Sequence, residues 1–354
     1  MNEGMTASLL AFATAMVASL GLTVPVRQFA LRVGMVDHPG PRKVHLQPIP
    51  LLGGIAIYSG VLLGMVVSSG SQALTQILGI LAGATLVILV GTLDDRGLLH
   101  HQIKLFVGMP IAALILLASG IHAQVFSVFF PGRMGAIADA AFTVFWVTGI
   151  TASFSIFDYM DGLCAGVAAI AALFFAVFAT LSGQVLVSTL AAAVMGAALG
   201  FLCWNFNPAK IFMGDGGAMF LGFSMATLSL KLRMTGTSQA ADWLVPALIL
   251  GVPIFDTVMV SISRSRRGLL PFATPGKDHT GHRLANLGLG TRFAVLTMYA
   301  LGFGFGALAL LVSRLGSAHA LEVAAIAVCV ALFAVALLEK APYERQKPKS
   351  KAAN

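Results

Sequence analysis

Residues 185–232 read VLVSTLAAAVMGAALGFLCWNFNPAKIFMGDGGAMFLGFSMATLSLKL, which is two apolar runs separated by a short polar stretch. A helix that crosses a bilayer needs about 20 mostly apolar residues, and the runs at 185–204 and 217–232 approach that length. Pro208 and the glycines between the runs indicate irregular backbone, which at membrane depth survives only where it lines protein or a polar cavity. The stretch therefore predicts two membrane helices and a special turn between them.

Segments of the same kind recur along all 354 residues. The chain is 58% hydrophobic and only 10% charged, whereas a soluble domain carries about 25% charged residues. Lipid must cover most of such a surface, and uninterrupted apolar segments of this length favour helices over a barrel. We predict an all-α, polytopic membrane protein with about eleven spans. The expected spans are 5–25, 51–69, 74–93, 103–121, 137–155, 163–182, 185–204, 217–232, 241–262, 292–313 and 319–338.

Basic residues predict the orientation of these spans. The flank of the first span, Met1 to Glu3, has no positive side chain, so we do not expect a cleaved signal there. Arg27 and Arg32 follow that span, which places the N-terminus outside. With spans alternating from there, the inner segments hold 18 of the 22 lysines and arginines and the outer segments hold four. This bias predicts a cytoplasmic C-terminus and a multi-pass protein of the inner (cytoplasmic) membrane.

We expect one transmembrane catalytic domain over 1–339 and a basic, solvated cytoplasmic tail over 340–354. The basic inner face explains the net charge of +8 without any nucleic-acid partner. Such a face suits anionic lipid head groups and phosphorylated substrates equally well. The three cysteines are too far apart in the sequence for a metal motif, and nothing requires a disulfide.

Acidic residues point to a shared site on the inner face. Ionisable groups near a membrane core are costly, which makes them functional candidates. Eight of the fourteen acidic residues fall on the predicted inner side or within a turn or two of it. These are Asp37, Asp94, Asp95, Asp158, Asp161, Asp215, Asp256 and Asp278.

Asp215 lies where the span at 217–232 begins. Backbone N–H groups at the start of a helix attract phosphate, and a carboxylate there can hold a divalent cation against that phosphate. Magnesium takes one or two carboxylates together with substrate phosphates, so Asp215 is a candidate metal ligand, with helix capping as the alternative. Asp94 and Asp95 are adjacent, and neighbouring helical residues point in different directions, so we expect them to serve two partners. A solvated helix end paired to Arg96 is the alternative reading.

Two basic loops complete the inner face. Arg42, Lys43 and His45 lie in a proline-rich loop and form a phosphate-clamp candidate, with a positive-inside anchor as the alternative. The pair Gly53-Gly54 opens the next span and predicts a close approach of backbone to another group.

In the last inner loop, His279 and His282 are three residues apart and share a helix face. The basic neighbours Lys277 and Arg283 disfavour a zinc pair, and a pyrophosphate site explains these residues better.

Taken together and in order, these motifs resemble those of the polyprenyl-phosphate N-acetylhexosamine-1-phosphate transferases, relatives of phospho-MurNAc-pentapeptide translocase. The match runs from about residue 36 to 290, and PAKIFMGD is its most specific piece. The resemblance implies transfer of a sugar-1-phosphate, most simply GlcNAc-1-phosphate, from a UDP-sugar to undecaprenyl phosphate, with release of UMP. This reaction starts lipid-linked glycan synthesis in the cell envelope. The implied cofactor is Mg²⁺, with Mn²⁺ as an alternative.

The resemblance also implies roles for individual residues. Asp215 looks like the metal ligand, and Asp94 looks like the base or the group that positions the acceptor phosphate. The catalytic carboxylates are expected at Asp94, Asp95, Asp158 and Asp161, and Asp158 is also a candidate metal ligand. The expected substrate-binding residues are Arg42, Lys43, His45, Lys104, Asn207, Lys210, His279, His282 and Arg283.

The chain departs from the family pattern in two places. Gly281 stands where the family's His-x-His-His cluster has its middle histidine. The family's Asn-x-x-Asn-x-x-Asp-Gly-x-Asp-Gly stretch meets SIFDYMDGLCAG at 155–166, and two registers fit. Either Asp158 replaces the second Asn, or Ser155 does. The first is preferred because it keeps an oxygen anion beside Asp215.

Other classes of protein share some of these features. A transporter would also have many spans and intramembrane carboxylates, but these cluster near the bilayer midplane, often on interrupted repeats. Here the carboxylates cluster at one face and no repeat is evident. A non-catalytic binder of lipid phosphate, and an enzyme using another UDP-N-acetyl sugar, are further alternatives. A homodimer is one of the oligomeric states left open.

Overall fold

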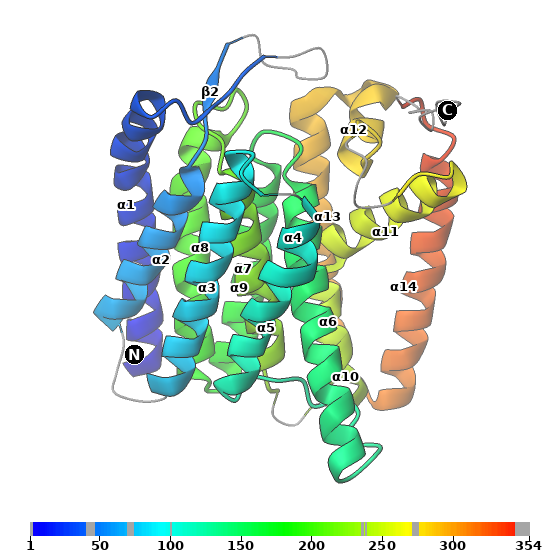
Figure 1. Ribbon diagram of the computed structural model, residues 1–354. Coiled ribbons are helices and arrows are strands. Elements are labelled where there is room, and N and C mark those ends of the chain that lie inside the picture. The colour runs from blue at the N-terminus through cyan, green and yellow to red at the C-terminus, as the bar shows by residue number, and fades with distance from the viewer. Residues whose placement is uncertain are drawn as a thin grey trace, which may run out of the picture.

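The computed structural model describes residues 3–39, 47–68, 74–99, 101–234, 237, 239–270 and 276–343. It is a bundle of helices, most of which run side by side (Figure 1). Within these residues the only sheet is a two-residue antiparallel ladder that pairs β1 (Val36–Asp37) with β2 (Ile49–Pro50). The prediction of an all-α architecture is thus confirmed. The candidates Arg42, Lys43 and His45 lie outside the described residues.

Each of the eleven expected spans coincides with a helix or a run of helices. Seven helices are long and apolar enough to cross a membrane, or eight if the bent pair α10–α11 counts as one span, among the residues described. The polytopic class is confirmed, while the count of eleven stays a prediction. The elements are α1 (Glu3–Arg32), α2 (Gly53–Ser68), α3 (Leu74–Asp95), α4 (His101–Ile103), η1 (Lys104–Gly108), α5 (Met109–Ala118), α6 (Arg133–Phe157), α7 (Leu163–Leu181), α8 (Val185–Asn205), α9 (Gly214–Lys231), α10 (Gln239–Ile249), α11 (Gly251–Arg266), α12 (Thr280–Leu284), η2 (Ala285–Leu289), α13 (Gly290–Val312) and α14 (Ser317–Leu338).

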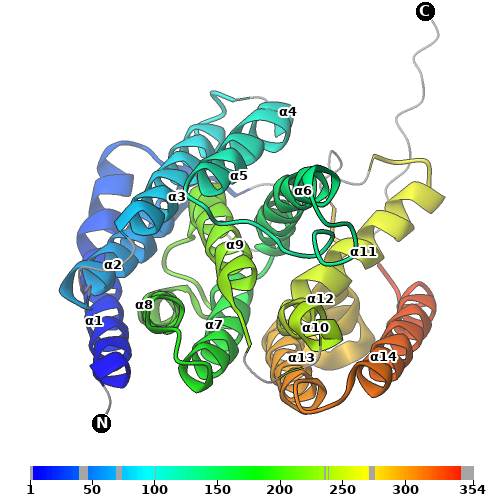
Figure 2. The same ribbon diagram turned by 90° about the horizontal axis from the view of Figure 1, so that it is seen from below.

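Helix α9 lies in the middle of the bundle, packed against α2, α3, α6, α7 and α8 (Figure 2). Glycines let two of these neighbours touch its first turn. A Cβ on Gly54 of α2 would lie 2.3 Å from Gly217 Cα, and a Cβ on Gly91 of α3 would lie 2.5 Å from Gly216 Cα. The close approach predicted for the Gly53-Gly54 pair is therefore confirmed, and the start of α9 is held rigidly from two sides.

The expected span at 241–262 is a bent pair of helices, because the chain turns by 75° between α10 and α11. Proline has no N–H, so Pro253 cannot donate to the carbonyl of Ile249 and the helix is interrupted there. Gly251 lies at the break, where a Cβ would approach the Phe305 ring of α13 to 2.9 Å. Helix α11 consequently runs obliquely to its neighbours (Figure 1).

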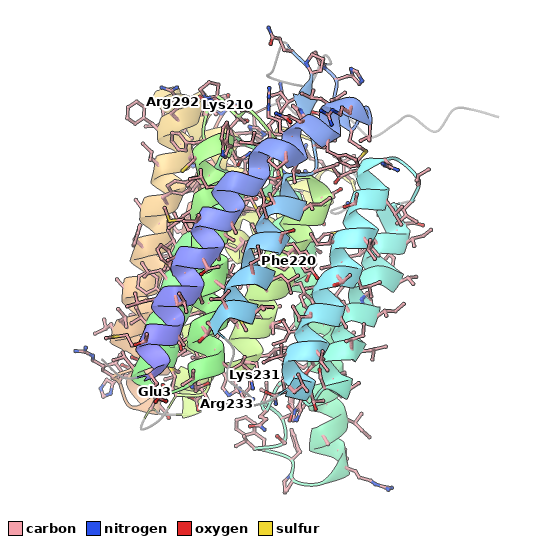
Figure 3. All side chains as sticks on the ribbon, turned by 90° about the vertical axis from the view of Figure 1, so that its left-hand side faces the viewer. Glu3, Lys210, Phe220, Lys231, Arg233 and Arg292 are labelled. Carbon is pink, nitrogen blue, oxygen red and sulfur yellow. The ribbon has the colours of Figure 1, made fainter. Side chains whose placement is uncertain are left out.

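The charged residues separate to the two ends of the bundle. Lys210 and Arg292 lie at one end, and Glu3, Lys231 and Arg233 lie at the other (Figure 3). Residues that the sequence assigns to the same side of the membrane thus share an end of the molecule.

Candidate active site

The first turn of α9 is built around a carboxylate from a neighbouring helix. Asp95, the last residue of α3, accepts hydrogen bonds from the backbone N–H of Asp215 at 2.9 Å and of Gly216 at 3.4 Å. Gly214 has φ +71°, and a Cβ there would lie 2.4 Å from Asp95 Oδ2. A helix has free N–H groups at its start, and an acceptor there satisfies them. Asp95 therefore caps α9 and fixes the place of Asp215.

Lys104 joins two other carboxylates at this point. Its Nζ atom lies 2.6 Å from Asp94 Oδ2 and 2.7 Å from Asp215 Oδ2. The three side chains are 13–26% exposed, so the cluster is partly shielded from water but still accessible. Asp94 and Asp95 thus serve two different partners, as their adjacency predicts.

The end of α6 approaches the same cluster. Ser155 Oγ donates a hydrogen bond of 2.7 Å to Asp215 Oδ1. Asp158 directly follows α6 and is partly buried. Burial raises the pKa of Asp158 to about 8, and the nearby carboxylates of Asp215, Asp95 and Asp161 add to the rise. The structure thus crowds carboxyl groups together here, and a bound cation would relieve the repulsion between their charged forms.

Asp161 and Asn207 hold the polar turn between α8 and α9. Asp161 Oδ2 accepts hydrogen bonds of 3.0 Å from Asn207 Nδ2 and from the Ala209 N–H. Arg292 of α13 donates to Asn207 Oδ1 at 3.2 Å and to its carbonyl at 3.0 Å. Lys210 is exposed beside this turn, with Nζ 5.3 Å from the centre of the Trp204 ring. Lys210 and Arg292 are both exposed, and Arg292 is bound to Asn207.

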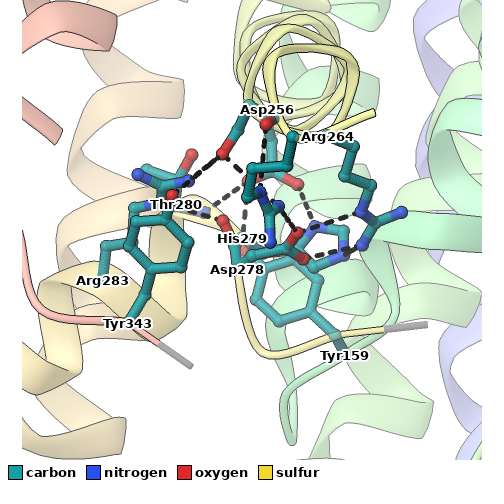
Figure 4. Close-up of polar contacts among 10 residues, drawn as sticks. Tyr159, Asp256, Arg264, Asp278, His279, Thr280, Arg283 and Tyr343 are labelled. Carbon is teal, nitrogen blue, oxygen red and sulfur yellow. Dashed lines mark hydrogen bonds and ion pairs between the residues drawn. The ribbon is translucent and has the colours of Figure 1, made fainter. Parts of the chain in front are cut away.

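A second cluster surrounds the turn before α12 (Figure 4). Asp256 of α11 is fully buried, and its two oxygens bind successive residues of that turn. Oδ2 lies 2.8 Å from His279 Nδ1, and Oδ1 accepts the Thr280 N–H at 2.7 Å. The Asp256 carboxylate thus fixes both the backbone of the turn and the orientation of the imidazole.

Tyr159 connects the two clusters, and no pattern in the sequence singled it out. Its ring stacks on His279 with centroids 4.2 Å apart and lies 4.9 Å from the ring of His282. Its hydroxyl accepts the Gly281 N–H at 2.9 Å, and a Cβ on Gly281 would lie 2.9 Å from that same oxygen. A glycine is therefore favoured at position 281, because the Tyr159 hydroxyl leaves no room for a side chain there. Because Tyr159 follows Asp158, one short loop reaches both clusters.

Asp278 is buried and forms two ion pairs with arginines. Its oxygens lie 2.7 Å from Arg264 Nη2 and 2.5 Å from Arg267 Nη2. Burial by itself would raise the pKa of Asp278, but the hydrogen bond and charge of Arg264, together with Arg267, lower it to about 2. Asp278 is one of the eight inner-side carboxylates of the sequence, but no pattern in the sequence indicates Arg264 and Arg267 as its partners.

Arg283 is fully buried, and each of its guanidinium nitrogens donates to a protein oxygen. These contacts favour a structural role for Arg283 over the predicted contact with a pyrophosphate. His282 is only partly buried and keeps the exposure that the predicted role requires.

Comparison with known proteins gives consistent matches. Residues 77–233 match the family described as Glycosyl transferase family 4. The chain is 38% identical over 307 residues to the "Probable undecaprenyl-phosphate N-acetylglucosaminyl 1-phosphate transferase" of Bacillus subtilis (strain 168), covering 86% of this chain and 85% of the relative. It is 31% identical over 366 residues to the "Decaprenyl-phosphate N-acetylglucosaminephosphotransferase" of Mycolicibacterium smegmatis, covering 95% and 90%. It is 29% identical over 293 residues to the "Undecaprenyl-phosphate alpha-N-acetylglucosaminyl 1-phosphate transferase" of Escherichia coli (strain K12), covering 77% and 76%.

Proposed function

Because the chain belongs to glycosyl transferase family 4, we propose that it transfers GlcNAc-1-phosphate from UDP-GlcNAc to undecaprenyl phosphate and releases UMP. The observation that carries this assignment is the cluster of Asp94, Lys104 and Asp215 at the start of α9. Phosphoryl transfer depends mainly on positioning and on neutralising charge. Lys104, held between two carboxylates at the start of α9, offers a positioned positive charge to a phosphate group.

The proposed cofactor is Mg²⁺, held by Asp215 and Asp158. The donor set fits, because the Asp215 carboxylate already faces a cationic atom, Lys104 Nζ, and lies near enough to Asp158 to raise the pKa of that carboxyl. Among the residues that the structure describes, no group of three or more His, Cys, Asp or Glu side chains forms a metal site. A site with few protein ligands is typical of magnesium. The ion takes one or two carboxylates and completes its coordination shell with waters and substrate phosphates. When bound, it would neutralise charge on the donor pyrophosphate.

The roles of the remaining residues are proposed from their positions in the site. Asp94 is proposed to orient the acceptor phosphate, with Lys104 supplying a positive charge beside it. His282, with His279 behind it, is proposed to contact the donor pyrophosphate from the opposite side of the Tyr159 loop. Lys210 is proposed to bind anionic groups at the exposed side of the turn between α8 and α9.

The site is proposed to face the cytoplasm, where a UDP-sugar is available. The topology proposed with it has eleven crossings of the inner membrane, an outside N-terminus and a cytoplasmic C-terminus. The bias of 18 basic residues to four supports that orientation.

The test is identification of both products. Purified protein in detergent is incubated with undecaprenyl phosphate, magnesium and either UDP-GlcNAc or UDP-GalNAc. We expect UMP and a lipid whose mass equals undecaprenyl pyrophosphate plus one N-acetylhexosamine, formed faster from UDP-GlcNAc. Release of UDP in place of UMP would show glycosyl transfer without phosphate, and absence of both products would refute the proposed function.

A further inference from the structure

The end of α14 is bound to the turn that carries His279. Arg283 lies between them and is 0% exposed. On one side its Nη1 donates to the Leu338 carbonyl at 2.8 Å and lies 2.8 Å from Glu339 Oε1. On the other side its Nε donates to the Asp278 carbonyl at 2.9 Å. The guanidinium thus ties the end of α14 directly to the residue before His279.

Tyr343 covers this guanidinium. Arg283 Cζ lies 3.8 Å from the centre of the Tyr343 ring, and Arg267 Cζ lies 5.4 Å from it. Arg283 and the Tyr343 ring lie side by side next to the turn (Figure 4). A cation over an aromatic face is attracted to the ring, and more strongly where water is excluded. Tyr343 therefore stabilises the positive charge that Arg283 carries into the interior.

The segment after α14 is consequently packed and not a solvated tail from its first residue. Ala341 is only 6% exposed, and the Pro342 carbonyl accepts a hydrogen bond of 3.0 Å from Asn286 Nδ2. Contacts at residues 339–343 reach α11, α12 and η2. The predicted boundary of the basic tail at residue 340 therefore cuts through a packed segment.

We propose that Tyr343 and Glu339 are positioning residues for sugar-phosphate transfer, acting through Arg283 on the His279 turn. This inference rests on the proposed function of that turn in donor binding. A buried arginine that loses a partner is left with an unsatisfied charge, which is costly. The guanidinium then shifts, the Asp278 carbonyl loses its donor, and the imidazoles lose their fixed place. The carboxylate cluster at Asp215 does not contact this segment, so magnesium dependence should be unaffected.

The experiment compares three variants of the full-length protein. Tyr343→Ala removes the ring, Tyr343→Phe keeps the ring, and Phe333→Ala removes a lipid-facing ring of α14 that is 65% exposed. We expect Tyr343→Ala to raise the KM for UDP-GlcNAc about tenfold, which lies between the effects of an exposed and a desolvated cation–π contact. The KM for undecaprenyl phosphate and the magnesium saturation curve should stay unchanged. Tyr343→Phe and Phe333→Ala should both keep the wild-type KM for UDP-GlcNAc.

Hydrogen–deuterium exchange measures the stability of the same turn without relying on activity. Tyr343→Ala should speed amide exchange in residues 278–284 and leave the first turn of α9 unchanged. Unchanged exchange in 278–284 overturns the inference, and so does faster exchange with an unaltered KM. Should wild type form no product, the proposed function fails, and the exchange result still decides whether Tyr343 holds the turn.

Discussion

Asp215 has a different partner on each carboxylate oxygen, and both come from other elements. Ser155 of α6 donates to Oδ1, and Lys104 of η1 donates to Oδ2. The sequence predicts Asp215 as a site residue, because it lies where an apolar run begins after a proline and glycines. Its partners could not be predicted, because they are 60 and 111 residues away in the chain. Only the three-dimensional fold, which places α6 and η1 at the start of α9, brings them together.

The two registers of the stretch at 155–166 can be separated at this carboxylate. We expect Asp158→Ala to raise the magnesium concentration needed for half-maximal activity at least ~10-fold, because magnesium prefers carboxylate to hydroxyl ligands. Ser155→Ala should change it less than about threefold, since under this register the serine hydroxyl donates to Asp215 and is not itself a magnesium ligand. Magnesium titrations of initial rate provide the measurement.

Thr297→Ala is the matched control, because its hydroxyl bonds to the Phe293 carbonyl within α13. The opposite order, with Ser155→Ala the more damaging, would favour the second register. Wild-type curves for both variants would remove this stretch from the site.

At the scale of elements, the apolar runs predict the helices within a few residues, because lipid leaves helices as the favoured solution for such runs. The bend at residue 250 was not predicted. Membrane helices tolerate proline, so Pro253 alone does not announce a break of 75°. The role of Tyr159 was not predicted either. An uncharged residue in a polar loop gives no sign of function in the sequence, and its stacking on His279 is evident only in the structure.

Asp278 gives the turn between α11 and α12 a pH-dependent stability. A carboxylate whose pKa is lowered to about 2 in the folded protein stabilises it above pH ~4 and loses this effect as the pH falls through about 2. We expect the Tm difference between wild type and Asp278→Asn to be largest at pH 7 and clearly smaller at pH 3.

Thermal unfolding in detergent at the two pH values measures this difference. Glu322→Gln, which changes an exposed carboxylate of α14, serves as the control and should show little difference at either pH. A Tm difference for Asp278→Asn that is the same at both pH values would contradict the role of the ion pairs.

For the whole molecule, the charge pattern predicts which residues share an end of the bundle. Lys210 and Arg292 lie opposite Lys231 and Arg233 (Figure 3). A rule about loops and lipid suffices for this, because it concerns only the order of spans along the chain. It does not reveal that the Asp215 cluster and the His279 cluster are joined by the loop after α6, which depends on three-dimensional packing.

Cysteine labelling tests the orientation. In a background without Cys164, Cys203 and Cys329, we expect Lys277→Cys to react with a membrane-impermeant maleimide only after permeabilisation. Arg314→Cys, on the predicted outer side, should react in intact cells. Labelling of residue 277 in intact cells would place the His279 turn outside and separate it from any cytosolic UDP-sugar.

The rate of UMP release by wild type and Asp215→Asn, with UDP-GlcNAc, undecaprenyl phosphate and varied magnesium, tests the central claim most directly. Asparagine keeps the shape of the side chain and removes the charge aimed at the transferred phosphate. We expect turnover to fall at least ~100-fold and its magnesium dependence to weaken, with Tm close to wild type, because phosphoryl transfer relies on positioned charge. Near wild-type turnover with unchanged magnesium dependence would contradict the assignment of Asp215 and of the site built around it.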